Sequence, residues 1–230
     1  INHFLDRDID KKMSRTQGRP IVSGSIKPSY ALIYGITLNV IAFGILWRYT
    51  NLLSAFLTLS ATLFYVFIYT MALKRTTAQN IVIGGAAGAI PPMVGWAAVT
   101  GNILDPTPLL LFAIIFFWTP PHFWALALLL KDDYADAGVP MLPVVSGVET
   151  TKKQIFIYTW LLLALMIITV LMTDQLGIIY GVCSISLTAV FMWMAWRLMR
   201  EEGIRRAKST YLFSLAYLTL IFLTIMVDAS

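Results

Sequence analysis

The first twenty residues carry side chains whose types and spacing could hold a cation against a phosphate. Asn2, Asp6 and Asp10 recur at every fourth position. A step of four residues advances an α-helix by about 40° around its axis, so these three side chains would share one narrow face. Asp8 would point away from that face and is expected to be a solvated surface charge. Carboxylate and amide oxygens suit a hard divalent cation such as Mg²⁺ better than they suit zinc or copper.

Basic residues follow this acidic face along the chain. Arg15 and Arg19 come directly after it, and Lys74 and Arg75 lie together in a later polar connection. Each could contribute positive charge to an anionic group beside the cation. Each could equally be a topology signal of a membrane protein, and for Lys12 the topology role is the favoured interpretation.

A second acidic group comprises Asp132, Asp133 and Asp136. Asp132 and Asp136 are again four residues apart and would share a face of a continuing helix. Two like charges only about 4 Å apart repel by about 4 kcal/mol at an effective dielectric of 20, so bringing the two groups together requires a positive charge between them. The alternative is that both groups are solvated loop charges.

The elements that must position these groups are hydrophobic helices. The chain is 58% hydrophobic and 13% charged, and its mean hydropathy is +0.76. Crossing a bilayer takes about 20 apolar residues. Seven segments satisfy or approach this length, which predicts an all-α, polytopic transmembrane bundle that forms a single domain over residues 1–230. The segments are Tyr30–Trp47, Leu52–Leu73, Ile81–Val99, Pro108–Leu130, Ile155–Met172, Gly177–Leu198 and Tyr211–Val227.

The connections between these segments predict an orientation. Of the 17 basic residues, all except Arg48 fall on one side when alternate connections are counted. The positive-inside rule assigns that side to the cytoplasm, or to the matrix in an organelle. Both acidic groups fall on the same side. The net charge of +5 therefore requires no nucleic-acid partner, and the expected surroundings are a lipid bilayer.

The pattern of these residues resembles a known family. The series Asn2, Asp6, Asp10, Met13, Arg15, Thr16, Arg19 and Pro20 resembles the first aspartate-rich motif of the UbiA superfamily of intramembrane prenyltransferases, and the acidic group at 132–136 resembles the second. Three further stretches are similar to the haem O synthase branch, and the resemblance covers essentially the whole chain. They are 73–92, Pro120–Ala127 and Ala137–Val145.

The resemblance implies a fold and a reaction. The family has nine transmembrane helices, so the chain is expected to lack the first helix and most of the second. The implied reaction transfers a farnesyl group from farnesyl diphosphate to a vinyl group of haem B, giving haem O for terminal oxidases. Mg²⁺ is the implied cofactor. The implied location is a bacterial inner membrane or the mitochondrial inner membrane, with an association with terminal-oxidase assembly proteins.

The resemblance also assigns roles to residues. Asn2, Asp6, Asp10, Asp132, Asp133 and Asp136 would hold the metal. Arg15, Arg19, Lys74 and Arg75 would bind the diphosphate, and Asp6, Asp10, Asp133 and Arg15 are the expected catalytic residues. The wider superfamily's spacing would select Asp132 and Asp136, whereas the haem O synthase branch centres on Asp133 and Tyr134. We rank Asp133 first, Asp132 second and Asp136 third.

Three residues are expected at the haem or in the cavity: His122, Tyr134 and Asn80. An ionisable residue inside a membrane span indicates function, and haem contact by His122 is one interpretation. The other is a neutral histidine bonded to a carbonyl that is freed at Pro120 and Pro121. The stretch 84–92 suggests a bent helix that lines the cavity. Gly84, Gly85 and Gly88 would allow close approach of a flat substrate or of a neighbouring helix, and helix packing is the favoured interpretation.

Two other functions fit parts of the pattern. One is a UbiA-type enzyme that prenylates a quinone precursor or another aromatic acceptor. The other is a transporter for an anionic ligand, which proline-broken helices would suit. Transporter sites usually lie at the membrane midplane between internal repeats. The acidic groups here lie at one interface, and the halves show no repeat.

Overall fold

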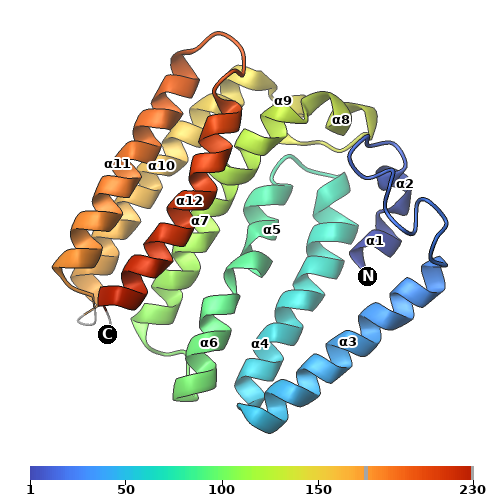
Figure 1. The fold of residues 1–230 in the computed structure, drawn as a ribbon, viewed down its shortest axis with the longest axis horizontal. Helices are drawn as coiled ribbons and strands as arrows, with labels where there is room; N and C mark the ends of the chain where they lie inside the picture. Colours follow the sequence, from blue (N-terminus) through green and yellow to red (C-terminus); the bar gives the residue numbers. More distant parts are fainter. Residues whose placement is uncertain (174–175, 229–230) are drawn as a thin grey trace.

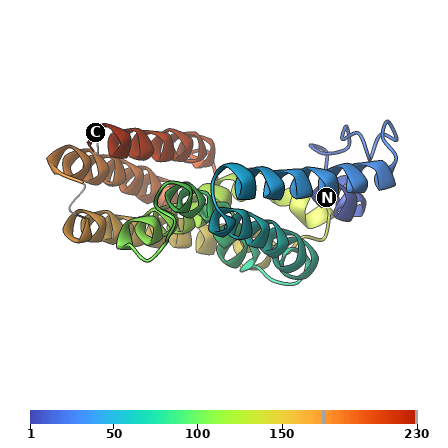
Figure 2. The ribbon, with the colours of Figure 1, turned by 90° about the horizontal axis from the view of Figure 1, so that it is seen from below.

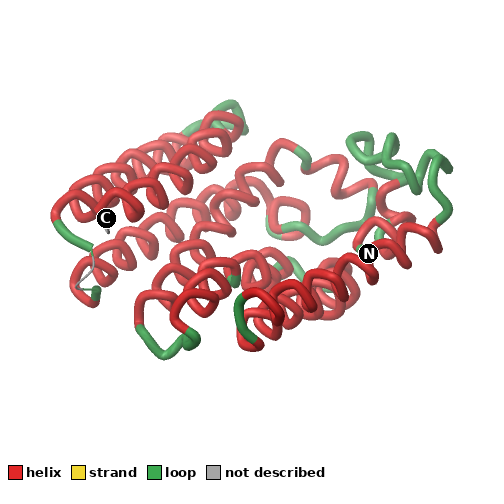
Figure 3. The backbone as a smooth tube through the Cα atoms, turned by 60° about the horizontal axis from the view of Figure 1, so that its bottom comes forward, coloured by secondary structure: helices red, strands yellow, loops and turns green. Residues whose placement is uncertain are grey.

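The computed structural model describes residues 1–173 and 176–228, and every regular element within these ranges is helical (Figure 1). Figure 3 shows helices joined by short connections, with the longest irregular stretch on the N-terminal side of the first long helix. Figure 2 shows an elongated bundle, with the last three helices at one end and the first long helix at the other.

Within residues 1–173 and 176–228, seven helical spans are long and apolar enough to cross a membrane, as predicted from the sequence. They are α3 (Pro28–Tyr49); α4 (Leu52–Leu63) with η1 (Phe64–Ala72) and η2 (Leu73–Arg75); α5 (Asn80–Ala89) with α6 (Pro91–Thr100); α7 (Pro106–Leu129); α10 (Gly147–Met172); α11 (Ile178–Arg200); and α12 (Ala207–Asp228). The fifth span begins at Gly147 rather than at Ile155, because the helix continues through a polar turn that holds Glu149 and Lys152. Four short helices are α1 (Asn2–Leu5), α2 (Arg7–Asp10), α8 (Lys131–Asp136) and α9 (Leu142–Val145).

Local chemistry accounts for the helix ends. Pro28 and Pro106 stand at the first position of α3 and α7, where a missing N–H costs nothing. The Asp105 carboxylate caps α7 by accepting a hydrogen bond from the Thr107 N–H at 2.7 Å. Gly101 ends α6 with a φ of 76°, which a residue with a Cβ rarely adopts.

The two proline pairs have different effects. The third span breaks at Ile90, where α5 ends and Pro91 begins α6, because Pro91 and Pro92 cannot donate to the preceding turn. This confirms the predicted bend. In contrast, α7 runs without interruption through Pro120 and Pro121.

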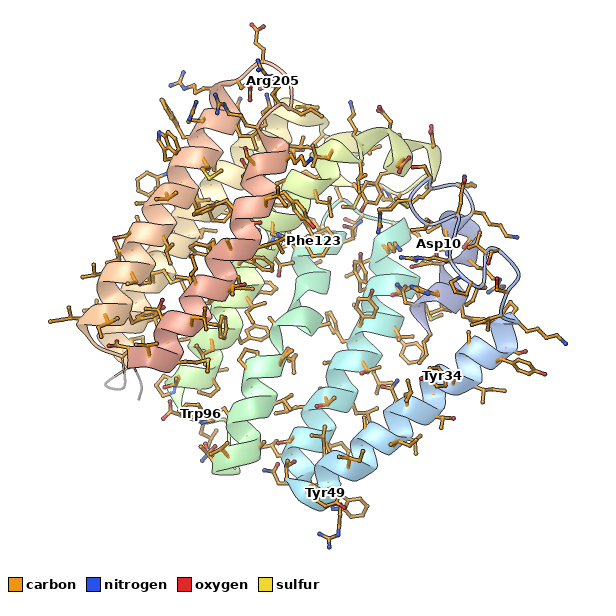
Figure 4. The ribbon with its side chains drawn as sticks, viewed as in Figure 1. Asp10, Tyr34, Tyr49, Trp96, Phe123 and Arg205 are labelled. Carbon is orange, nitrogen blue, oxygen red and sulfur yellow. The ribbon has the colours of Figure 1, made fainter. Side chains whose placement is uncertain are left out.

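The core of the bundle is centred on α7, which packs against α5, α10 and α12. Ile114 and Trp118 of α7 join a buried cluster with Phe191 of α11 and Tyr217 of α12. No residue of α3 is fully buried, although the helix packs against α4 and α1. Arg205 lies at one end of the molecule, and Tyr49 lies at the opposite end beside Arg48 (Figure 4). Arg48, the basic residue predicted on the opposite side from the other sixteen, therefore lies at the end remote from the α11–α12 connection.

The N-terminal segment lies beside the second span and below α8 (Figure 1). The sequence predicts one continuous helix over Asn2–Asp10. The structure instead has two short helices, α1 and α2, because Asp6 adopts a φ of −91° and a ψ of 7° between them.

Candidate active site

Asp6 is the centre of the acidic face and is completely buried. The Lys74 Nζ donates to its Oδ2 at 2.5 Å, and the Arg75 Nη2 lies 3.8 Å from its Oδ1. Asp6 Oδ1 has no hydrogen bond although it is buried. A buried carboxylate requires such compensating charges, because desolvation otherwise favours its protonated form. The two cations come from η2, so the end of the second span contacts the motif.

Asp10 is 2% exposed and pairs with Arg19, whose Nη1 lies 2.6 Å from its Oδ2. The buried Thr16 hydroxyl donates to the Asp10 backbone carbonyl at 2.9 Å. That bond folds the segment after α2 back over the motif. The Arg19 guanidinium, nine residues further along the chain, is thereby held against the Asp10 carboxylate.

Asn2 makes the third contact of this face. Its Oδ1 lies 3.4 Å from the hydroxyl of Thr70, a completely buried residue of η1. η1 is a π-helix, a form that is rare except as single turns and is frequent at functional sites. The three residues of the first motif thus contact the second span and the segment after α2.

Asp8 lies at the surface, as expected, and it also forms an ion pair. Its side chain is 59% exposed, but both oxygens accept hydrogen bonds from Arg75, at 2.7 and 2.8 Å. These bonds hold the pKa of the Asp8 carboxyl at about 2, below its usual range. Arg75 is therefore shared between Asp8 and the Asp6 carboxylate.

The second acidic group meets the first segment through Asp133. The Ser14 hydroxyl lies 2.8 and 3.0 Å from the two Asp133 carboxylate oxygens, across 119 residues of sequence. Asp132 and Asp136 are exposed on α8, and Arg15 is exposed without an ion pair to any described residue. Tyr134 packs against a cluster that contains Ile9, and burial raises the pKa of its phenol.

The donor set fits a hard cation at the first motif. Within the described ranges, no three His, Cys, Asp or Glu side chains gather closely enough to form a metal site. The two acidic groups therefore do not merge into one cluster. The buried Asp6 Oδ1 nevertheless has no hydrogen bond, and Asp10 and Asn2 add oxygens on the same segment. These oxygens match the ligands that Mg²⁺ takes when it bridges a protein to a phosphate.

A cavity of about 480 Å³ lies between the second, third and fourth spans. Tyr65 and Tyr69 line it from η1, and Phe123 lines it from α7 (Figure 4 labels Phe123). Tyr69 also packs against the buried cluster to which Ile9 of the acidic segment belongs, so this cluster connects the cavity wall with the segment. A methyl group at Gly84 would lie 2.3 Å from the Tyr69 Cδ2, so the glycine permits this position of the ring.

The structure places the three expected cavity residues outside this lining. The His122 Nδ1 lies 2.7 Å from Ser214 Oγ, and its ring stacks between Trp118 and Tyr211 with centroid distances of 4.2 and 4.9 Å. Its partner is therefore a hydroxyl of α12 rather than a freed carbonyl of α7. Tyr134 lies on α8. Asn80 is completely buried, and neither polar atom of its side chain has a hydrogen bond.

Several residues of this region were not predicted from the sequence. They are Ser14, Tyr65, Tyr69, Thr70 and Phe123. Tyr65 and Tyr69 are an aromatic pair four residues apart within a span, and that spacing was a usable signal. Thr70 had no such signal, because only the π-helical register turns it toward Asn2.

The fold and this site define a polytopic membrane protein with a buried acidic motif beside a cavity between its spans. The sequence matches the model of the UbiA prenyltransferase family over residues 1–221, and the chain belongs to that family. The protein named protoheme IX farnesyltransferase in Synechocystis sp. is 50% identical over 230 residues, which are 100% of this chain and 72% of that protein.

Solved structures share the fold. The apo structure of a UbiA homologue from Aeropyrum pernix superposes with a TM-score of 0.76 at 23% identity, over 100% of this chain and 83% of that one. A UbiA homologue from Archaeoglobus fulgidus, solved with DMAPP and Mg²⁺, gives a TM-score of 0.67 at 17% identity, over 98% and 81%. The chain is thus a prenyltransferase of this family, and the transporter alternative is not supported.

Proposed function

We propose that this protein transfers a farnesyl group from farnesyl diphosphate to a vinyl group of haem B, with addition of water, to give haem O. One observation carries the reaction class: Asp6 is completely buried beside Lys74 and keeps one oxygen without a hydrogen bond to any described residue. It belongs to the segment whose Ile9 lies in the buried cluster against which Tyr69 of the cavity wall packs. The choice of acceptor rests on the relatives' name, which Synechocystis and Nostoc proteins at 50% and 51% identity share.

The oxygens of Asn2, Asp6 and Asp10 would hold Mg²⁺, and Asp133, which contacts the same segment through Ser14, would act on the site from α8. Bound Mg²⁺ acts as a Lewis acid that offsets the negative charge on the departing diphosphate. Asp132 and Asp136 are exposed and would contribute only through their long-range electrostatic effect on the site. The proposal therefore keeps Asp133 as the first-ranked residue of the second motif.

Four basic side chains would bind the diphosphate: Lys74, Arg75, Arg19 and Arg15. Lys74 and Arg19 already lie against the motif as partners of Asp6 and Asp10. From these positions the two basic groups would contact the phosphate oxygens of a diphosphate held at the motif. Arg15 is exposed on the same segment and is free to reach the substrate. Preorganised positive charge at the leaving group is a large catalytic term in such reactions.

The chain's aromatic side chains would act on the positive charge that forms on the farnesyl group. Breaking the allylic C–O bond leaves positive charge on the farnesyl carbon. When that carbon bonds to the terminal vinyl carbon of haem, the charge moves to the other vinyl carbon, where a water molecule adds and loses a proton to give the hydroxyl group. The faces of Tyr65 and Tyr69 offer cation–π stabilisation at the cavity wall. The apolar remainder of the lining excludes water until the carbon–carbon bond has formed.

The location follows from the charge pattern. We place the acidic motifs on the cytoplasmic or matrix side of an inner membrane, where the substrate diphosphate is soluble. An association with terminal-oxidase assembly proteins remains a prediction.

Product mass spectrometry tests the proposal. Membranes that contain the protein are given Mg²⁺, farnesyl diphosphate and an equimolar mixture of haem B and aromatic acceptors. The expected product has the mass of haem O and is absent with Asp6→Asn. Prenylation of an aromatic acceptor without haem O would instead support the quinone-precursor alternative.

A further inference from the structure

Thr70 sits at the point where the π-helix meets the first motif. Upstream in α4, the hydroxyls of Thr58 and Thr62 donate to the carbonyl four residues earlier, at 3.0 and 3.2 Å. The hydroxyl of Thr70 instead contacts the Tyr65 carbonyl five residues earlier, at 2.9 Å. The same oxygen lies 3.4 Å from Asn2 Oδ1. The π-helical register therefore brings one buried hydroxyl between a backbone carbonyl and a side-chain amide.

A hydroxyl donates only one proton but can accept on two lone pairs. The Tyr65 carbonyl is the nearer acceptor, so it takes the proton of Thr70. The lone pairs of Thr70 then face Asn2. They match the NH₂ group of an amide rather than its oxygen, and the orientation of an asparagine amide is decided by the hydrogen-bond network around it. Turned in this way, the Asn2 amide donates to Thr70 through Nδ2.

We propose that Thr70 is a positioning residue: it accepts a hydrogen bond from the Asn2 NH₂ group and so leaves the Asn2 amide oxygen as the free atom of that side chain. An amide binds a hard cation through its oxygen and not through its NH₂ group. Thr70 thus selects the rotamer of Asn2 that can act as a ligand. The inference rests on the proposed function, because it takes Asn2 as part of the Mg²⁺-diphosphate site.

Binding of Mg²⁺ with inorganic diphosphate to the detergent-solubilised protein tests the inference. The thermal midpoint is measured against Mg²⁺ concentration at a fixed saturating diphosphate concentration. Thr70→Val keeps the shape of the side chain and removes the hydroxyl. We expect it to raise the half-saturating Mg²⁺ concentration about 3- to 10-fold, the factor that one hydrogen bond of ordinary strength provides. Thr70→Ser keeps the hydroxyl and is expected to stay within about 2-fold of the wild type.

Thr58→Val is the matched control, because it removes a hydroxyl from the same span at a bond made only to the helix's own backbone. It is expected to leave the Mg²⁺ requirement unchanged. Wild-type behaviour of Thr70→Val overturns the inference while the proposed function stands. A wild type that shows no Mg²⁺-dependent shift with diphosphate overturns both.

Asn2→Asp separates orientation from packing. A carboxylate presents an oxygen whichever way it turns, so it needs no partner to select its rotamer. In the Asn2→Asp background, the effect of Thr70→Val is therefore expected to shrink to about 2-fold or less. An undiminished effect in that background would show that Thr70 acts through packing alone, and would overturn the inference.

Discussion

Lys74 Nζ lies 2.5 Å from Asp6 Oδ2, so a buried ion pair joins two segments that are 68 residues apart in the sequence. Asp6 is completely buried, and the Lys74 side chain is 16% exposed. The pair therefore ties the N-terminal segment to the end of the second span. It also stores positive charge beside the carboxylate that the proposed reaction uses.

Removing Lys74 is expected to destabilise the fold. Lys74→Met leaves the Asp6 carboxylate with only Arg75 at 3.8 Å, and an uncompensated buried charge costs about 3 kcal/mol of the free energy of unfolding. Thermal unfolding in detergent would show the loss. The double variant Asp6→Asn/Lys74→Met is expected to regain most of the stability and none of the turnover. A single variant as stable as the wild type would contradict the role of the pair.

The buried carboxylate of Asp10 is expected to matter far more for turnover than the exposed carboxylate of Asp8. Asp10→Asn removes one of the two buried carboxylates, and we expect haem O formation to fall at least about 1,000-fold, because both the cation ligand and the partner of Arg19 are weakened. Asp8→Asn is the matched control on the same segment, since the Asp8 side chain is exposed and forms its ion pair with Arg75. Equal losses in the two variants would argue against a special role for the buried face.

Gly84 is expected to control the position of Tyr69. Gly84→Ala places a methyl group 2.3 Å from the Tyr69 ring, and the forced shift is expected to cost about 1–3 kcal/mol of the free energy of unfolding and to lower turnover. Gly95→Ala is the control, because a Cβ at Gly95 meets no atom within 4 Å. Thermal unfolding and haem O yield are measured for both. The prediction fails if the two variants behave alike.

His122 is expected to act in packing rather than as a haem ligand. Its Nδ1 is hydrogen-bonded to Ser214, and its buried ring stacks against Trp118 and Tyr211. His122→Phe keeps an aromatic ring in the stack and removes both nitrogens. The absorption spectrum of bound haem B should then be unchanged. A spectral shift that reports a lost axial ligand would restore the haem-binding interpretation.

The Asp8–Arg75 pair has a defined pH dependence. The folded-state pKa of Asp8 is about 2, below the ordinary value of 3.8, so the pair's contribution to stability is fully present above pH 3.8 and is lost as the pH falls toward 2. The difference in thermal midpoint between the wild type and Asp8→Asn should therefore be constant from pH 5 to pH 8. It should narrow only below about pH 4. A difference that changed between pH 6 and pH 7 would assign the titration to another group.

Much of the architecture could be predicted because it depends on local composition. A run of about 20 apolar residues must form a helix in lipid, where each backbone polar group needs a partner within the segment. This rule predicts the seven spans. The bend follows from the proline pair at Pro91, and the position of Arg48 follows from counting alternate connections. The spacing of Asp6 and Asp10 likewise indicated a shared face, and both are buried.

Only the tertiary structure decided which partners these residues have. The sequence could not show that Asp133 meets Ser14 while Asp132 and Asp136 stay exposed, because α8 is a separate short helix whose direction depends on packing. It could not place His122 against Ser214, since that contact depends on how α12 lies along α7. Nor could it show the π-helical register that turns Thr70 to Asn2. Helix formation is decided by short-range hydrogen bonds, whereas the pairing of side chains from distant segments depends on how whole helices pack.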